Sequence, residues 1–151
     1  DLGGRMWLFN KKKDINIHTV EMLRCISLSC NHMNYNLCYS FFAEKKDMIW
    51  LFSANSYVEL QNKTVELKKK IIDNTYVEQM YKIIKENGLI TYVENYKKPE
   101  QNSEIVLLDA TEYYFGMGFN DGFSKTVGSF SVNDNLERFF FELVQQYCNK
   151  V

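Results

Sequence analysis

The chain has 151 residues, of which 46% are hydrophobic and 25% are charged, and this composition excludes an intrinsically disordered protein. Its formal net charge of −1 excludes a general electrostatic attraction to nucleic acid or to an anionic membrane. No apolar run approaches the roughly 18 residues of a membrane-spanning helix, so we expect neither nucleic acid nor a membrane as partner.

Length and cysteine use indicate one cytoplasmic domain. A chain of this size can bury a core without covalent cross-links, so we expect its four cysteines to be reduced thiols. The run that begins at Met6 is typical of a natural bacterial start. We therefore interpret residues 1–5 as an added tail and residues 6–151 as a single domain.

Strand signals dominate the first half of the chain, at residues 20–30, 37–44, 48–53 and 63–71. In the first of these segments apolar side chains alternate onto one face, and Arg24 is a misplaced charge on that face. The charged residues 45–47 are typical of a hairpin tip, and the lysines of the last segment suit an exposed edge strand. The four strands predict a meander.

The second half alternates helix and strand signals. Asn74 or Thr75 can cap a helix that ends at Asn87-Gly88, and residues 89–93 fit a short strand. After a loop at residues 95–103, we expect a long strand over 105–119 and its partner over 123–131. Residues 134–150 form an amphipathic helix, whose apolar positions are Leu136, Phe139, Phe140, Leu143, Val144 and Tyr147.

These elements predict an α+β fold. We expect an antiparallel sheet of about six or seven strands with two helices packed on one face.

The stretch FGMGFNDGFSKTVGSF, residues 115–130, combines four glycines with four phenylalanines. Its G-x-G-x-x-x-G spacing differs from the dinucleotide fingerprint, and alternating residues flank it on both sides, so it predicts a hairpin. A three-residue turn with left-handed Gly122 would set Phe119 opposite Phe123. Gly116 and Gly118 then share the other face of the strand, where a ligand or another backbone could approach closely.

Three further groups of side chains could carry chemistry. Cys30, His32 and Cys38 are candidate metal ligands, although their spacing matches no standard zinc pattern, and they could also support a thiol-dependent activity. Arg24 and Asp109 interrupt buried-looking strands, so we interpret them as a polar pair that could bind a ligand. The sequence predicts no cofactor.

Aromatic residues could form an interaction surface, which would bind a protein partner or a second copy of the chain; they are Tyr35, Tyr39, Phe41, Phe42, Trp50 and Phe52. Their strands carry apolar groups on both faces, and the face that does not cover the core needs another cover.

Residues 75–148 resemble uncharacterised α+β domains of low-GC Gram-positive bacteria. The resemblance is carried by Lys85-Glu86-Asn87-Gly88, Leu108-Asp109-Ala110-Thr111-Glu112-Tyr113-Tyr114, Asp121-Gly122 and Gly128-Ser129, followed by the closing helix. The chain departs from that pattern at Ser131-Val132-Asn133, where those domains often carry a proline. The family implies no agreed activity, so the resemblance assigns no catalytic residue.

The sequence therefore favours a bacterial binding or interaction domain that is not an enzyme. Two alternatives stay open: an immunity-type protein that blocks a toxin, and a thiol-dependent enzyme that uses Cys30 or Cys38 with His32.

Overall fold

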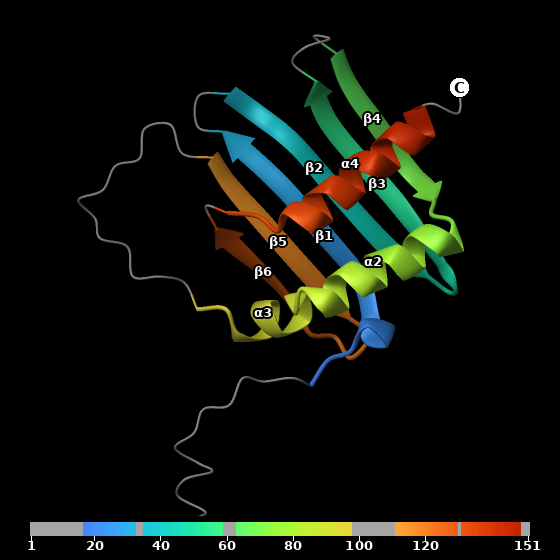
Figure 1. Ribbon diagram of the computed structural model, residues 1–151, viewed down its shortest axis with the longest axis vertical. Coiled ribbons are helices and arrows are strands. Elements are labelled where there is room, and N and C mark those ends of the chain that lie inside the picture. Colours follow the sequence, from blue (N-terminus) through green and yellow to red (C-terminus); the bar gives the residue numbers. More distant parts are fainter. Residues whose placement is uncertain (1–16, 33–34, 59–62, 98–110, 130, 149–151) are drawn as a thin grey trace, which may run out of the picture.

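The computed structural model describes residues 17–32, 35–58, 63–97, 111–129 and 131–148, and the statements below concern these residues. They form a six-stranded antiparallel sheet with three α-helices (Figure 1). The predicted α+β class is confirmed, with one more helix than the sequence pattern indicates.

The first four strands form the predicted meander; they are β1 (Leu23–His32), β2 (Tyr35–Lys46), β3 (Ile49–Val58) and β4 (Lys63–Ile71). Each pairs antiparallel with the next along the chain. The β2–β3 turn lies at Asp47 and Met48, and Asp47 takes a left-handed φ of 57°, which short polar residues tolerate.

A hairpin of β5 (Thr111–Phe119) and β6 (Ser124–Ser129) extends the sheet beyond β1, which gives the strand order β4-β3-β2-β1-β5-β6. The predicted turn is confirmed: the Phe119 N–H donates to the Phe123 carbonyl over 2.8 Å, and Gly122 has a φ of 91°. Phe115 therefore faces Val127 across the ladder. The expected strand residues 105–110 lie outside the described residues.

Two α-helices, α2 (Asn74–Glu86) and α3 (Leu89–Asn95), lie between the meander and the hairpin in the chain, and α4 (Asp134–Cys148) follows the hairpin. The strand predicted at residues 89–93 is wrong, because this segment is α3. Gly88 turns the chain with a φ of 59°, and Leu89, Ile90 and Val93 are buried at helical spacing.

The start of the first predicted strand also needs correction. Val20–Met22 form a 3₁₀ turn, η1, and a register irregularity between Leu23 and Cys25 interrupts the pairing of β1 with β5. This irregularity breaks the alternation, so Leu23 and Ile26 are both buried and Arg24 is exposed. Arg24 is therefore not a misplaced charge on the core face.

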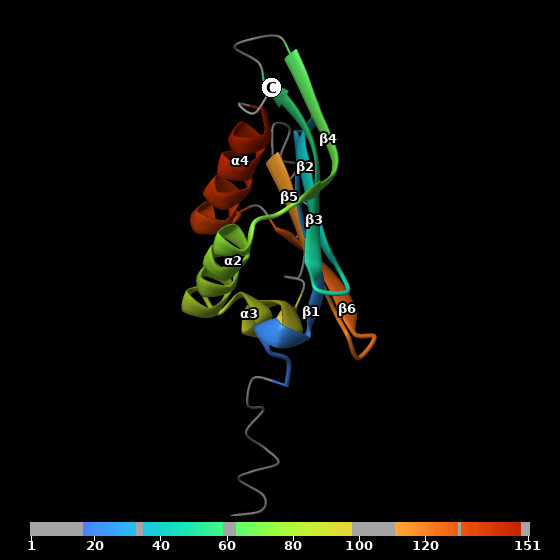
Figure 2. The same cartoon turned by 90° about the vertical axis from the view of Figure 1, so that its right-hand side faces the viewer.

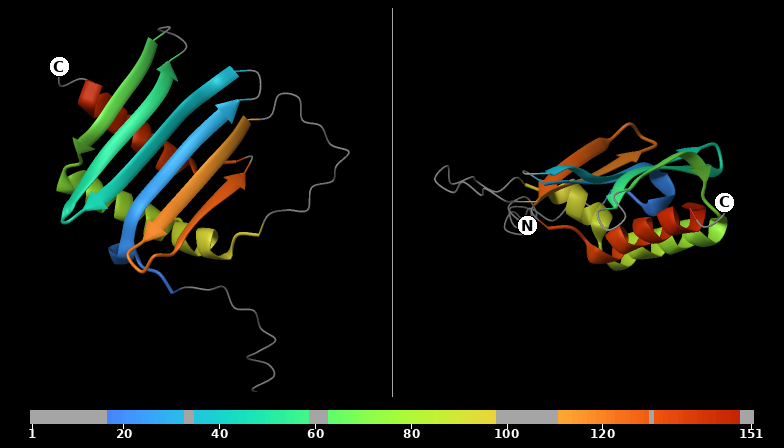
Figure 3. Two further views of the ribbon diagram at one scale, coloured as in Figure 1. Left: turned by 180° about the vertical axis from the view of Figure 1, so that it is seen from behind. Right: turned by 90° about the horizontal axis from the view of Figure 1, so that it is seen from above.

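All three helices cover the same face of the sheet, and the two layers are seen edge-on in Figure 2. Aromatic side chains of the sheet meet α4 at the centre: the rings of Phe52 and Phe140 stack with centroids 5.8 Å apart, and Phe41 lies 5.5 Å from Phe140. No helix of the described residues covers the opposite face (Figure 3). The core therefore lies between one sheet face and the helices.

Candidate functional site

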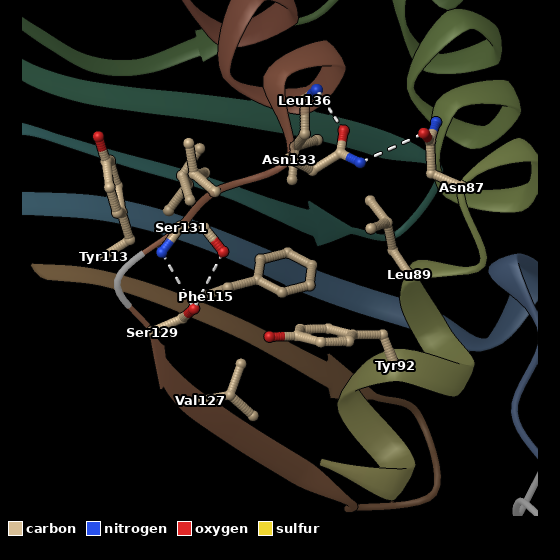
Figure 4. A pocket seen from close by; sticks show the side chains of 12 residues that line it. Asn87, Leu89, Tyr92, Tyr113, Phe115, Val127, Ser129, Ser131, Asn133 and Leu136 are labelled. Atoms are coloured by element: carbon tan, nitrogen blue, oxygen red, sulfur yellow. Dashed lines mark hydrogen bonds between the residues drawn. The ribbon is translucent and has the colours of Figure 1, made fainter. Parts of the chain in front are cut away.

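A pocket of about 240 Å³ opens between α3, the β5–β6 hairpin and the beginning of α4 (Figure 4). Its lining residues come from four separate stretches of the chain: Leu28, Asn87, Leu89, Tyr92, Tyr113, Phe115, Val127, Ser129, Ser131, Val132, Asn133 and Leu136.

Apolar side chains form most of the pocket wall. Phe115 and Val127 project into it from the facing hairpin strands, and Tyr92 extends toward it from α3 (Figure 4). Leu89 and Leu136 complete the wall from α3 and α4. Side chains alternate between the two faces along β5 and β6. Phe115 and Val127 lie opposite each other, on the face that the helices cover.

Asparagine side chains fix one rim of the pocket. Asn133 accepts a hydrogen bond from the Leu136 N–H over 3.0 Å, which caps the start of α4. The same side chain donates to the Asn87 Oδ1 over 3.2 Å, while Asn87 donates to the Ile83 carbonyl over 2.8 Å at the end of α2. The amide pair thus joins the end of one helix to the start of another and holds this rim in place.

Serine side chains form the other polar part of the rim. The Ser131 N–H donates to the Ser129 Oγ over 3.1 Å (Figure 4). Both hydroxyl groups remain able to exchange hydrogen bonds with a guest, since a hydroxyl has one donor and two acceptor sites.

None of the described residues that line this pocket is Asp, Glu, His, Lys, Arg or Cys. Tyr92 and Tyr113 are its titratable residues, and burial, followed by the nearby Cys30, raises the pKa of the Tyr113 phenol above its usual range. The pocket therefore presents an uncharged surface at neutral pH and offers apolar contact with a few hydrogen-bonding groups.

The candidate thiol chemistry is not supported at Cys30. Burial, followed by a hydrogen bond with the Cys38 thiol, raises the pKa of Cys30 to about 12, so this side chain is a thiol at neutral pH. The four cysteines are free, and no three described His, Cys, Asp or Glu side chains are grouped closely enough to hold a metal ion. Cys30, His32 and Cys38 thus do not form the three-ligand group considered from the sequence.

The predicted polar pair cannot be assembled from the described residues, because Asp109 lies outside them. Arg24 is exposed beside Lys45 and Lys46, where it lines an open surface depression near the β2–β3 turn. Glu21 and Asp47 line the same depression, so its charges are mixed.

The two strand glycines lie beneath side chains of neighbouring strands. A Cβ on Gly116 would come within 2.6 Å of the Ser27 Oγ and 2.9 Å of the Thr126 Oγ1. A Cβ on Gly118 would come within 2.6 Å of the Cys25 Sγ. The space above the glycines is therefore used by the sheet itself, which explains their presence without a ligand.

Most of the aromatic residues considered for an interaction surface belong to the core. Tyr39, Phe41, Trp50 and Phe52 are buried on the helix-covered face, whereas Phe42 is 38% exposed on the other face. The side chain of Tyr35 lies outside the described residues. The outer face near Phe42 carries mainly small polar residues, so an extended aromatic patch is not formed by the described part of the sheet.

Sequence reasoning missed the pocket residues of α3, above all Tyr92. The spacing of Leu89, Ile90 and Val93 after Gly88 was the signal that could have revealed a second helix here and placed Tyr92 on its exposed side.

Comparison with known proteins gives no relative: no family model matches the chain, and no curated protein and no solved structure matches it significantly. The resemblance of residues 75–148 to a bacterial family stays a prediction. Among the described helices, none combines the length and the apolar character that crossing a membrane requires.

Proposed function

We propose that this protein is a non-catalytic binding domain whose pocket takes up an uncharged, largely apolar small molecule. The observation that carries the proposal is the pocket itself, with apolar walls, hydroxyl and amide groups at its rim, and no charged residue among its described lining. Catalysis by acid, base or thiolate needs groups of the kinds that are missing from this lining.

The size of the pocket limits the guest. An enclosed apolar cavity of about 150 Å³ holds a benzene molecule. The 240 Å³ found here therefore suits a bicyclic ring or a branched group of similar volume. A ring held between Tyr92 and Phe115 would gain apolar and aromatic contacts, while Ser129 or Asn133 would receive its polar atom.

The uncharged lining of the pocket also disfavours charged guests. An ionic guest would lose its hydration and find no opposite charge to replace it, which costs several kcal/mol in an apolar site. A neutral guest has no such loss, so the pocket selects neutral molecules over charged molecules of the same shape.

Ligand-observed NMR with three matched probes tests this function. Indole is the neutral probe, indole-3-acetate carries a negative charge, and tryptamine carries a positive charge. Indole has about nine heavy atoms, so at roughly 0.5 kcal/mol per atom we expect a Kd of about 0.5 mM. We expect the charged probes to bind at least about tenfold more weakly.

A matched pair of variants locates the binding site. Ser129→Phe directs a ring into the pocket from the inward side of β6, and we expect it to abolish indole binding. Ser124→Phe places the same change on the exposed outer side of β6 and should leave binding unchanged. Equal binding of all three probes, or unchanged indole binding in Ser129→Phe, would refute the proposed function.

A further inference from the structure

A histidine outside the pocket lies between two carboxylates that are far apart in the sequence. The ring of His18 places Nδ1 3.2 Å from the Glu94 Oε1 and Nε2 2.7 Å from the Asp121 Oδ2. Glu94 belongs to α3, and Asp121 lies in the turn of the β5–β6 hairpin (Figure 1). His18 therefore links the helix and the hairpin that form opposite walls of the pocket.

Backbone hydrogen bonds fix the side chain of Glu94 in this position. Its side chain is buried and accepts hydrogen bonds from the backbone N–H groups of Ile17, over 3.2 Å, and His18, over 3.1 Å. Lys125 is a further charged group at this junction, where its Nζ donates to the carbonyls of Glu94 and Tyr96 near the end of α3.

Each nitrogen of the His18 imidazole ring faces a carboxylate oxygen. A carboxylate oxygen can only accept, so both ring nitrogens satisfy their partners when both carry hydrogen. The ring also packs against Phe119 and Phe123, with centroid distances of 4.3 Å and 4.8 Å, and aromatic faces attract a cation.

Loss of the proton affects the two contacts differently. A neutral imidazole keeps one N–H, and the buried Glu94 is the partner that most needs it. The lone pair on Nε2 would then face the Asp121 oxygen at 2.7 Å and repel it. The side chain of Asp121 is 44% exposed and can turn to solvent. The contact of His18 with the hairpin turn is therefore the one that breaks.

Asp121 itself stays ionised across the neutral range. The Phe123 backbone N–H, followed by His18, holds the pKa of this carboxyl below its ordinary value. A depressed pKa means that the Asp121 contribution is present at neutral pH and is lost as the pH falls through the acid range. Imidazole groups in general change their charge between about pH 5 and 8, whereas carboxyl groups do so in the acid range.

We propose that His18 is a proton-dependent latch between α3 and the β5–β6 hairpin, and that its release at alkaline pH loosens the pocket. The effect on the pocket rests on the proposed binding function, whereas the latch itself does not. Protonated His18 holds the two walls together. When His18 is neutral, hydrogen bonds from Lys125 to the Tyr96 carbonyl and from the Tyr96 hydroxyl to the Gly128 carbonyl still connect the end of α3 with β6.

Ring ¹⁵N NMR of His18 and indole affinity between pH 5.5 and 8 test the proposal together. Indole carries no charge in this range, so a change in its affinity reports on the protein. We expect two protonated ring nitrogens at pH 5.5, an Nδ1–H tautomer at pH 8, and indole binding about fivefold weaker at pH 8, near the lower end of usual site-to-site couplings. A His18→Gln variant assigns the ring signals against His32, the other histidine of the chain.

An Asp121→Asn variant gives the most specific test of the latch. The Asn Oδ1 can keep the hydrogen bond of the Phe123 N–H, while the amide nitrogen replaces the Asp121 Oδ2 and donates to neutral Nε2. The link then survives at high pH and is repelled at low pH, so we expect the pH dependence of indole binding to reverse. Asp47→Asn makes the same change in the β2–β3 turn and should behave as the wild type.

The outcomes separate the two proposals. If indole does not bind at any pH, the proposed function is wrong. The ring ¹⁵N signals of His18 still test the latch in that case. A His18 ring that has a single proton throughout, or that does not respond to Asp121→Asn, overturns the latch. A ring that titrates as expected while indole affinity stays constant overturns the coupling of latch and pocket.

Discussion

Truncation of Phe140 tests which side of α4 faces the core. Its ring is fully buried and lies 5.5 Å from Phe41, 5.8 Å from Phe52 and 5.5 Å from Phe139. A buried phenylalanine removes about 150–200 Å² from water, which at about 25 cal/mol per Å² corresponds to roughly 4–5 kcal/mol. Alanine keeps part of this buried area, and phenylalanine-to-alanine changes in protein cores, cavity included, cost about 3–5 kcal/mol, so we expect Phe140→Ala to lower the free energy of unfolding by about 3–5 kcal/mol.

The neighbouring residue supplies the control. Phe141 is 37% exposed and packs edge-to-face with Tyr39 and Phe41, so its truncation opens a surface notch and leaves no closed cavity. We expect Phe141→Ala to cost about 1–2 kcal/mol.

Urea unfolding followed by circular dichroism measures both variants, with comparison of midpoints at an unchanged slope. A larger loss in Phe141→Ala than in Phe140→Ala would show that α4 is rotated by about one residue from the orientation described here. The packing argument would then be wrong.

Two further changes test the sheet and its ionisable groups. Gly118→Val should destabilise the fold by about 1–3 kcal/mol, because the new Cβ would meet the Cys25 Sγ at 2.6 Å; a variant as stable as the wild type in the same urea assay would contradict this. Stability should also fall as the pH rises above about 9–10, since burial raises the pKa of the Tyr39 phenol and raises that of the Cys30 thiol to about 12. The unfolded chain releases these protons first, so their contribution is complete below the unfolded pKa values and is lost as the pH rises through the folded ones. Tyr39→Phe should flatten the decline between pH 8 and 10.5, and an equally steep decline in that variant would count against the argument.

Local chemistry made several parts of the fold predictable. The β5–β6 turn follows from Gly122, which accepts a left-handed backbone that most residues avoid. The buried face of α4 follows from apolar residues at helical spacing, such as Leu136, Phe140 and Leu143. In both cases the residues that carry the pattern lie within a few positions of one another.

The errors have an equally physical origin. One irregularity after Leu23 moved Arg24 from the predicted core face to solvent, because a shift of one residue exchanges the two faces of a strand. The short apolar run at 89–93 fits either a strand or a helix. It forms a helix because Gly88 turns the chain before it and its apolar side chains pack on the sheet.

The sequence by itself determined where turns, helix faces and most strands lie, since these depend on neighbouring residues. Tertiary structure alone decided which of them meet. The His18 contacts with Glu94 and Asp121 join residues 76 and 103 positions apart, and the pocket combines four stretches of chain. Periodicity records which side of an element is apolar, whereas a site built between elements depends on how those sides are packed against one another.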